Sequence, residues 1–340
     1  GPLSALQTTL LLLFAILAAT ASWKFVEQPI LAQRAPRRIT FAWGASAMMV
    51  TAGVAGAIFL SDGAPQRFSP QALQLFAAKD DHNQQRARCH SNEWMTIDYK
   101  DNCVFGAPGV EPVAAVWGDS AGAELVVALG EAAAERRQAV MQITSSGCPP
   151  SIDYQLQDQR LCISHNRRTL EHLAQDARIR TVVLAANFSR YPWQDQPRFR
   201  AGLTRSVETL TAAGKRVVLT QPPPNPWFAA PSALGLVAHR GGDLETIGIS
   251  RKQYDMENRE AISFLDDLAR RTGAMVFRPA DALCTLTFCP AFEAGTGVLY
   301  FNGNHISVTG ARVAISRFPF SAFPPPGKSE LTGLKGTDGE

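Results

Sequence analysis

The sequence predicts an α/β fold with a mostly parallel five-stranded sheet, preceded by two transmembrane helices. From about residue 113, short runs of β-branched residues alternate with amphipathic stretches, which is typical of a parallel sheet with connecting helices. Two long uncharged apolar stretches stand before that region. Of the 340 residues, 46% are hydrophobic and 19% charged, which excludes a disordered or collagen-like chain and leaves room for roughly two domains.

The membrane prediction rests on residues 3–23 (LSALQTTLLLLFAILAATASW) and 39–61 (ITFAWGASAMMVTAGVAGAIFLS). Each stretch is long enough to span a bilayer, which takes about 20 apolar residues. A buried core helix is the alternative for either stretch. A secretory signal peptide is a second alternative for the first one, since Ala19-Thr20-Ala21 resembles a cleavage site, although no basic residue stands before it.

The charge pattern predicts the topology. The net charge is +3, and the loop between the two apolar stretches carries all of it, with Lys24, Arg34, Arg37 and Arg38 against Glu27. By the positive-inside rule this loop is cytoplasmic, so the second span leads everything after residue 61 to the opposite side. The remaining residues sum to zero, and we therefore expect no nucleic-acid partner.

The cysteines agree with an extracytoplasmic domain, because disulfides persist in oxidising compartments. Their number is even, and although six cysteines allow fifteen connectivities, we predict nearest-neighbour pairs. The pairs are Cys89 with Cys103, Cys148 with Cys162, and Cys284 with Cys289. Zinc is the alternative, but the sequence has no CxxC pair and no HExxH motif, and we predict no metal site.

The soluble part is divided as follows. Residues 62–112 are predicted to be a linker or extension, with a helix near 70–78, and residues 113–323 form the domain. The strand candidates are 113–117, 139–144, 181–185, 216–220 and 274–277. The run 221–226 (QPPPNP) reads as a rigid loop after the fourth strand, and residues 324–340 are predicted to be disordered.

Two residues carry the predicted chemistry. Ser120, in the sequence Gly118-Asp119-Ser120-Ala121-Gly122, lies between the first strand and a helix-like stretch at 123–137. Glycines permit a tight turn there, and a helix N-terminus stabilises negative charge beside a nucleophilic hydroxyl. His305 follows a predicted strand and opens the last helix, where it would serve as the base. A helix cap for the serine and a capping or surface histidine are the alternatives.

These residues resemble a known superfamily as a set. The GDS sequence around Ser120, Gly147 after the second strand, Asn187 after the third and His305 near the end resemble the four blocks of the SGNH/GDSL hydrolases, over residues 113–318. The resemblance implies a three-layer sandwich, Ser120 as nucleophile and His305 as base. It also implies an oxyanion hole built from the amide of Ser120, Gly147 and Asn187. It implies no bound cofactor in this part of the protein.

A second resemblance concerns the membrane part. Residues 23–29 (WKFVEQP) are similar to the W-x-F-x-E-x-P signature that closes the last helix of the acyltransferase-3 membrane domain. The resemblance implies that residues 1–38 are that helix with a cytoplasmic loop, and 39–61 an additional transmembrane helix. The chain, which begins Gly-Pro, would be the C-terminal part of a fusion similar to bacterial O-antigen acetylases. Such proteins lie in the bacterial inner membrane with the SGNH domain in the periplasm.

The last superfamily block, D-x-x-H, differs here because Asn302 stands where the acid is expected. In serine proteases the loss of that acid lowers turnover by about 10⁴, through the wrong histidine tautomer. Three interpretations remain: a Ser120–His305 dyad assisted by Asn302, another carboxylate that orients His305, or a weakly active site. We favour the first, which predicts that Asn302→Asp leaves activity unchanged or raises it.

The function expected from both resemblances is transfer of an acyl group, namely acetyl, onto hydroxyls of a cell-surface polysaccharide such as a lipopolysaccharide O-antigen. The partners would be a polysaccharide or lipid-linked glycan acceptor and the acyltransferase-3 domain in cis, which would take its acyl group from acyl-CoA. The alternatives are a membrane-anchored periplasmic carbohydrate esterase and a weakly active carbohydrate-binding domain. Five aromatic residues are candidates for stacking on a sugar, with core packing as the alternative: Trp117, Phe188, Tyr191, Trp193 and Trp227.

Overall fold

The computed structural model describes residues 5–32, 36–156, 158–191 and 197–325. The chain divides into two compact units, Gly1–Arg67 and Phe68–Glu340. The second unit therefore begins within the segment that the sequence analysis assigned to a linker. Most of the tail predicted to be disordered, from residue 326 on, lies outside the described residues.

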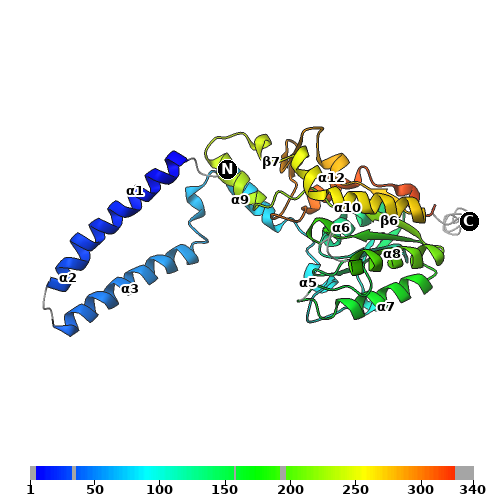
Figure 1. The fold of residues 1–340 in the computed structure, drawn as a ribbon, viewed down its shortest axis with the longest axis horizontal. Coiled ribbons are helices and arrows are strands. Elements are labelled where there is room, and N and C mark those ends of the chain that lie inside the picture. Colours follow the sequence, from blue (N-terminus) through cyan, green and yellow to red (C-terminus); the bar gives the residue numbers. More distant parts are fainter. Residues whose placement is uncertain (1–4, 33–35, 157, 192–196, 326–340) are drawn as a thin grey trace, which may run out of the picture. The chain divides into compact units, whose positions relative to one another are not determined.

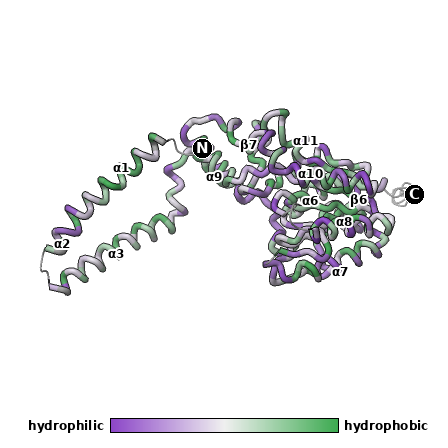
Figure 2. The backbone as a smooth tube through the Cα atoms, in the orientation of Figure 1, coloured by the Kyte–Doolittle hydropathy of each residue, from purple (hydrophilic) through white to green (hydrophobic). Residues whose placement is uncertain are grey.

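The first unit is helical. Helix α1 (Ala5–Ser22) continues through a π-helical turn (Trp23–Glu27) into α2 (Gln28–Ala32), and α3 (Arg37–Leu60) follows. Figure 2 shows α1 and α3 as largely hydrophobic helices. Two segments are long and apolar enough to cross a membrane, Thr8–Ile30 and Arg38–Leu60. The first extends beyond the predicted stretch because the helix continues through the WKFVEQP sequence, including Lys24.

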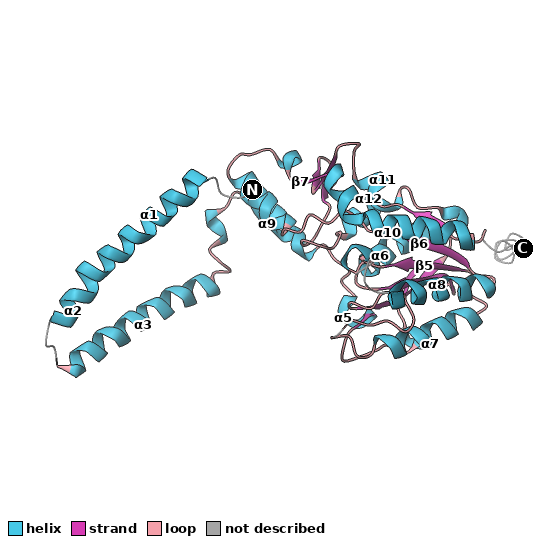
Figure 3. Ribbon diagram, viewed as in Figure 1, coloured by secondary structure: helices cyan, strands magenta, loops and turns pink. Residues whose placement is uncertain are grey.

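The second unit is built on a seven-stranded sheet (Figure 3). Its path is β1-β4-β3-β5-β6-β8, all parallel, with β2 antiparallel on β4. The strands are β1 (His90–Ser91), β2 (Val104–Gly106), β3 (Pro112–Gly118), β4 (Ala139–Ser145), β5 (Thr181–Ala185), β6 (Arg216–Thr220) and β8 (Met275–Phe277). The five predicted strands correspond to β3, β4, β5, β6 and β8. Strands β1 and β2 come from the predicted linker, and at two and three residues they are too short to show a periodic pattern.

Helices cover both faces of this sheet and make a three-layer sandwich (Figure 1). Helices α6 (Gly122–Ala134) and α12 (Val308–Ile315) pack on one face, and α7 (Cys162–Gln175), α8 (Pro197–Ala212) and α10 (Arg251–Thr272) pack on the other. Successive side chains of a strand point to opposite faces. Accordingly, Ala114 and Val116 of β3 join the first core, whereas Ala115 and Trp117 join the second.

Smaller elements complete the unit. Helix α4 (Pro70–Ala77), close to the predicted helix, packs against α9 (Ala230–His239), and α5 (Arg86–Cys89) and α11 (Ala280–Leu283) are single turns. Two short antiparallel pairs join β7 (Gly248–Ser250) to β9 (Phe288–Pro290) and β10 (Phe292–Glu293) to β11 (Gly297–Val298).

All six cysteines are paired in sequence-adjacent disulfides, Cys89–Cys103, Cys148–Cys162 and Cys284–Cys289. The first bond ties the start of β1 to β2. The second joins the loop after β4 to the start of α7. Within the described ranges, no cluster of three or more His, Cys, Asp or Glu side chains is placed to hold a metal ion.

Candidate active site

The nucleophile candidate lies where β3 passes into α6. Strand β3 ends at Gly118, and Asp119, Ser120 and Ala121 lead to the first residue of α6, Gly122. A Cβ on Gly118 would come within 1.7 Å of the carbonyl oxygen of Ala185 on β5. A Cβ on Gly122 would lie 3.0 Å from Val116. Both glycines thus serve close packing of the turn against the sheet, whereas the sequence analysis assigned them to the tight turn itself.

The fold brings Ser120 and His305 together across 185 residues of sequence. Oγ of Ser120 lies 2.8 Å from Nε2 of His305, within hydrogen-bond distance. His305 lies in the loop that the bridge between Tyr300 and Ile306 closes, two residues before the N-cap of α12. It does not open that helix, as the sequence suggested, because Ser307 is the N-cap and its hydroxyl accepts a hydrogen bond from the amide of Gly310.

Asn302 orients the histidine through its oxygen. Oδ1 of Asn302 lies 3.1 Å from Nδ1 of His305, and it also accepts hydrogen bonds from the backbone amides of Asn304 (3.0 Å) and His305 (2.9 Å). Two N–H donors can only face an oxygen, so the side-chain amide cannot present its NH₂ group here. Nδ1 of His305 must therefore carry the proton, which leaves the Nε2 lone pair free for the Ser120 hydroxyl.

Burial and, to a smaller extent, nearby positive charges disfavour the protonated form of His305. Burial, followed by the nearby charges of Arg86 and Arg190, lowers the pKa of His305 to about 4. Among the described residues, no carboxylate is hydrogen-bonded to the His305 ring. The interpretation in which another acid orients His305 thus finds no support, and the lowered pKa leaves the ring neutral at physiological pH.

Candidate amide donors follow the two strands that flank β3. Gly147 follows β4 in a left-handed conformation (φ 58°), which favours glycine. Its amide and that of Ser120 make no hydrogen bond within the described part of the chain. The side chain of Asn187, after β5, donates one Nδ2 proton to the carbonyl of Asn304 (3.2 Å), so this residue adjoins the histidine loop. Free backbone amides at this edge are the groups that an oxyanion hole requires.

Asp119 connects these parts, a role that the sequence analysis did not assign. This carboxylate is 2% exposed. It accepts hydrogen bonds from the amide of Ala121 (2.8 Å), the amide of Asn187 (3.0 Å) and the hydroxyl of Tyr191 (2.6 Å). Burial raises the pKa of Asp119, while these donors act in the opposite direction. These hydrogen bonds fix the turn that carries Ser120 to the turn that carries Asn187. The GDS motif, which includes Asp119, was the sequence signal for this residue.

The sequence analysis also assigned no role to Asn225. It lies in the proline-rich loop after β6, and its Nδ2 donates to Oδ1 of Asn187 and to Oγ of Ser189, both at 3.0 Å. Oδ1 of Asn187 also accepts a hydrogen bond from the hydroxyl of Ser189 (2.6 Å), so the NH₂ group of Asn187 must point toward the histidine loop. A polar residue between two prolines, Pro224 and Pro226, was the sequence signal.

A second histidine lies at the same sheet edge. His90 of β1 is buried, with Nδ1 2.8 Å from Oγ1 of Thr144 and Nε2 3.1 Å from Oγ of Ser146, next to Gly147. Burial, with smaller contributions from Arg86 and other groups, lowers the pKa of His90 to about 3. His90 therefore holds the loop after β4 as a neutral ring, and no periodic or motif signal distinguished it.

Burial decides between sugar stacking and core packing for most of the five aromatic candidates. Trp117, Phe188 and Tyr191 are buried, so core packing explains them. Trp193 lies outside the described residues. Trp227 is 48% exposed, on the loop that continues from Asn225.

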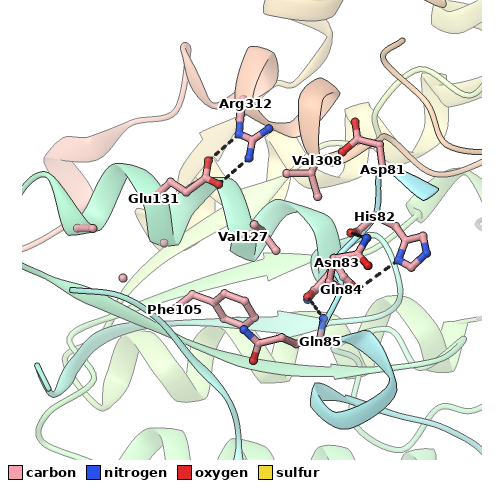
Figure 4. Close-up of a pocket in the computed structure, with 13 residues that line it drawn as sticks. Asp81, His82, Asn83, Gln84, Gln85, Phe105, Val127, Glu131, Val308 and Arg312 are labelled. Atoms are coloured by element: carbon pink, nitrogen blue, oxygen red, sulfur yellow. Dashed lines mark hydrogen bonds and ion pairs between the residues drawn. The ribbon is translucent and has the colours of Figure 1, made fainter. Parts of the chain in front are cut away.

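A pocket of about 460 Å³ lies apart from this site (Figure 4). Residues 81–85, α6 and α12 enclose it, and the ion pair between Arg312 and Glu131 (2.7 Å) crosses one side of it. Neither Ser120 nor His305 lines it. Ser120, with His305 beside it, instead lies at the carboxyl end of a parallel strand, where sites of open α/β sheets form.

Comparison with known protein families decides the classification. Residues 88–319, more than half of the chain, match the family described as "SGNH domain (fused to AT3 domains)". The chain belongs to this family. Its SGNH domain is thus an acyl-related enzyme domain of the SGNH superfamily, found in fusions with acyltransferase-3 domains. The match begins at residue 88, ahead of the predicted boundary at 113, and so includes β1 and β2.

Solved structures are similar to this chain to different degrees. The periplasmic domain of a lipopolysaccharide acetyltransferase from Salmonella ser. Paratyphi A is similar with a TM-score of 0.55 and 15% identity, covering 73% of this chain and 95% of that one. Est24, a carbohydrate acetylesterase from Sinorhizobium meliloti, aligns with a TM-score of 0.34 and 17% identity over 60% of this chain and 95% of its own. Comparison with curated proteins finds no match.

Proposed function

We propose that the SGNH domain transfers an acyl group, specifically acetyl, onto a hydroxyl of a cell-surface polysaccharide through an acyl-enzyme on Ser120. The observation that carries this proposal is the 2.8 Å contact between Oγ of Ser120 and Nε2 of His305, with unbonded amides at Ser120 itself and at Gly147, after the neighbouring strand β4. A nucleophile, its base and donors for a tetrahedral oxyanion are the parts that acyl transfer needs.

In the first half-reaction, Nε2 of His305 takes the proton of the Ser120 hydroxyl while Oγ forms a bond to the acyl carbonyl carbon. The oxyanion accepts hydrogen bonds from the amides of Ser120 and Gly147 and from Asn187. The bond to the leaving group then breaks, and the leaving group takes the proton from His305. Asn302 keeps the proton on Nδ1 throughout, through the 3.1 Å contact with its oxygen.

In the second half-reaction, an acceptor hydroxyl attacks the acyl-enzyme and gives its proton to Nε2 of His305. The bond to Oγ breaks, the ester leaves with the sugar, and Ser120 recovers the proton. Water in place of the sugar hydroxyl would give hydrolysis by the same steps. The identity of the second nucleophile therefore separates a transferase from an esterase.

Two observations support transfer rather than hydrolysis. The family is one in which SGNH domains are fused to acyltransferase-3 domains, and two helices ahead of the domain are long and apolar enough to cross a membrane. We place the SGNH domain in the periplasm of a bacterium, with the helices in the inner membrane. The acyltransferase-3 domain would supply acyl groups from cytoplasmic acyl-CoA.

The test uses the full chain in detergent with p-nitrophenyl acetate, with and without surface polysaccharide from the source strain that has been de-O-acetylated with base. We expect a Ser120-linked acetyl group by peptide mass spectrometry and acetylated polysaccharide by NMR. Ser120→Ala should abolish both. Release of acetate alone would identify an esterase, and the absence of any Ser120-dependent turnover would refute the proposal.

A further inference from the structure

Two exposed aromatic side chains stand out on the second unit. Among the described residues from Phe68 on, the exposed aromatics are Trp94 and Trp227, with exposed fractions of 82% and 48%. Tryptophan is enriched at binding surfaces, where its ring offers an apolar face and its N–H remains a hydrogen-bond donor.

Both tryptophans follow strands at the edge that carries the active site. Trp94 comes three residues after β1 ends, and Trp227 comes seven residues after β6 ends. In the order β1-β4-β3-β5-β6, the strand that leads to Ser120 is the middle one. Because neighbouring strands lie about 4.8 Å apart, the two flanking strands lie about 10 Å to either side of β3.

The loop of Trp227 is fixed against the histidine loop. The backbone amide of Trp227 donates to the carbonyl of Gly303 (2.8 Å), and a Cβ on Gly303 would lie 3.2 Å from the backbone of Phe228. Nε1 of Trp227 donates to Oε2 of Glu257 on α10 (3.0 Å), which tethers one edge of the indole. Trp227 also has a φ of 61°, a conformation that costs a bulky residue free energy and is typical of functional sites.

The loop of Trp94 is fixed on the opposite side. Oδ1 of Asn92 accepts hydrogen bonds from the amides of Trp94 (2.9 Å) and Met95 (3.0 Å), which makes a tight turn. At the base of this turn the carbonyl of Ser91 accepts a hydrogen bond from the amide of Ser146 (2.9 Å), the residue before Gly147. Each tryptophan loop therefore contacts a loop that carries part of the catalytic site.

We propose that Trp94 and Trp227 are two aromatic platforms for pyranose rings, at either end of an acceptor subsite that runs across Ser120. The C–H groups on one face of a pyranose carry partial positive charge and fit the negative face of an indole ring. Two separate indole rings on loops that hydrogen bonds fix suit a glycan chain, whereas a lipid would need a continuous apolar patch. The inference rests on the proposed function, since it names the groups that would hold its acceptor.

The experiment measures binding separately from chemistry. Calorimetry on the full chain carrying Ser120→Ala, titrated with the de-O-acetylated polysaccharide, gives a Kd without turnover. We expect Trp94→Ala and Trp227→Ala each to raise that Kd by about tenfold, which corresponds to about 1.4 kcal/mol. Trp227→Phe, which keeps an aromatic face, should lose less.

Leu286→Ala is the matched control, since Leu286 is 94% exposed and lies beside Arg251 and Met256 of α10, in a hollow that neither tryptophan loop lines. Its Kd should equal that of the parent. With Ser120 restored, both tryptophan variants should still form the acyl-enzyme from p-nitrophenyl acetate at the parent rate, which shows that the site is folded. A Kd within twofold of the parent for both variants, or a loss confined to acylation by the small ester, would overturn the inference. Neither result requires failure of the acyl-enzyme proposal.

Discussion

Asn302→Asp tests most directly how His305 is oriented by an amide in place of the expected carboxylate. The substitution places a negative charge about 3 Å from Nδ1 of His305 in an otherwise similar side chain. The two backbone amides that now hold the oxygen of Asn302 would hold a carboxylate oxygen equally well. The geometry should therefore survive, and only the charge should change.

The size of the effect follows from Coulomb's law. Opposite charges about 4 Å apart attract by about 4 kcal/mol at an effective dielectric constant of about 20. Partial desolvation of the new carboxylate offsets part of this, and we expect about 2.7 kcal/mol to remain, which is about two pKa units. The pKa of His305, now about 4, would then rise to about 6, and the imidazolium formed during acylation would be stabilised.

The assay is the pH dependence of acylation by p-nitrophenyl acetate between pH 4 and 8. His305 must be neutral to act as a base, so the native protein should keep its acylation rate until the pH falls to about 4. In Asn302→Asp this acid limb should move to about pH 6. Above pH 7 the rate should equal or exceed the native rate, by up to roughly tenfold.

Asn304→Asp is the control, because it adds the same charge to the same loop at a residue whose side chain does not contact His305. It should move the acid limb far less. A large loss of turnover in Asn302→Asp would refute the reasoning, since it would show that the native amide does more than orient the ring. An unmoved acid limb would refute the assignment of His305 as the base.

Three further outcomes follow from the structure. Asn225→Ala should lower kcat about tenfold at unchanged KM, because Asn187 loses one of the two donors that set its side-chain amide. Stopped-flow acylation measures this rate, and an unchanged kcat would remove Asn225 from the positioning network. Urea unfolding should show that the free energy of unfolding falls as the pH drops below 6.5. Burial lowers the pKa of His90 to about 3 and of His165 to about 4, so the unfolded chain binds more protons than the native one. The slope should reach about 1.4 kcal/mol per pH unit for each histidine, and a flat profile would contradict this reasoning. Gly118→Ala should abolish folding of the domain, because the new Cβ would collide with the β5 backbone, and a native-like melting temperature would count against that packing.

Local sequence patterns predicted the parts of the fold that repeat. The β-branched runs of β3, β4, β5, β6 and β8 are typical of strands buried on both faces. The long apolar stretches predict the two helices that are long enough to cross a membrane. The short strands β1 and β2 left no such pattern, because two or three residues cannot show a period. Their place is decided by pairing with β4 and by the Cys89–Cys103 bond.

The candidate site divides in the same way. The sequence by itself determined the chemical groups, since Ser120, Gly147, Asn187 and His305 stand in an order that a superfamily shares, and Asn302 marks the departure. Their relation was decided only by the tertiary structure, because a hydrogen bond between residues 185 positions apart depends on how the sheet brings loop ends together.

The supporting groups belong wholly to the tertiary structure. Asp119 and Asn225 both form hydrogen bonds with Asn187, which lies 68 and 38 residues away from them in sequence. The two exposed tryptophans flank the Ser120 turn only because of the order of strands in the sheet. The same holds for Asn302, whose oxygen faces His305 because two backbone amides of its own loop require an acceptor there. Residue type is a local property, whereas orientation, burial and proximity depend on the whole packed chain.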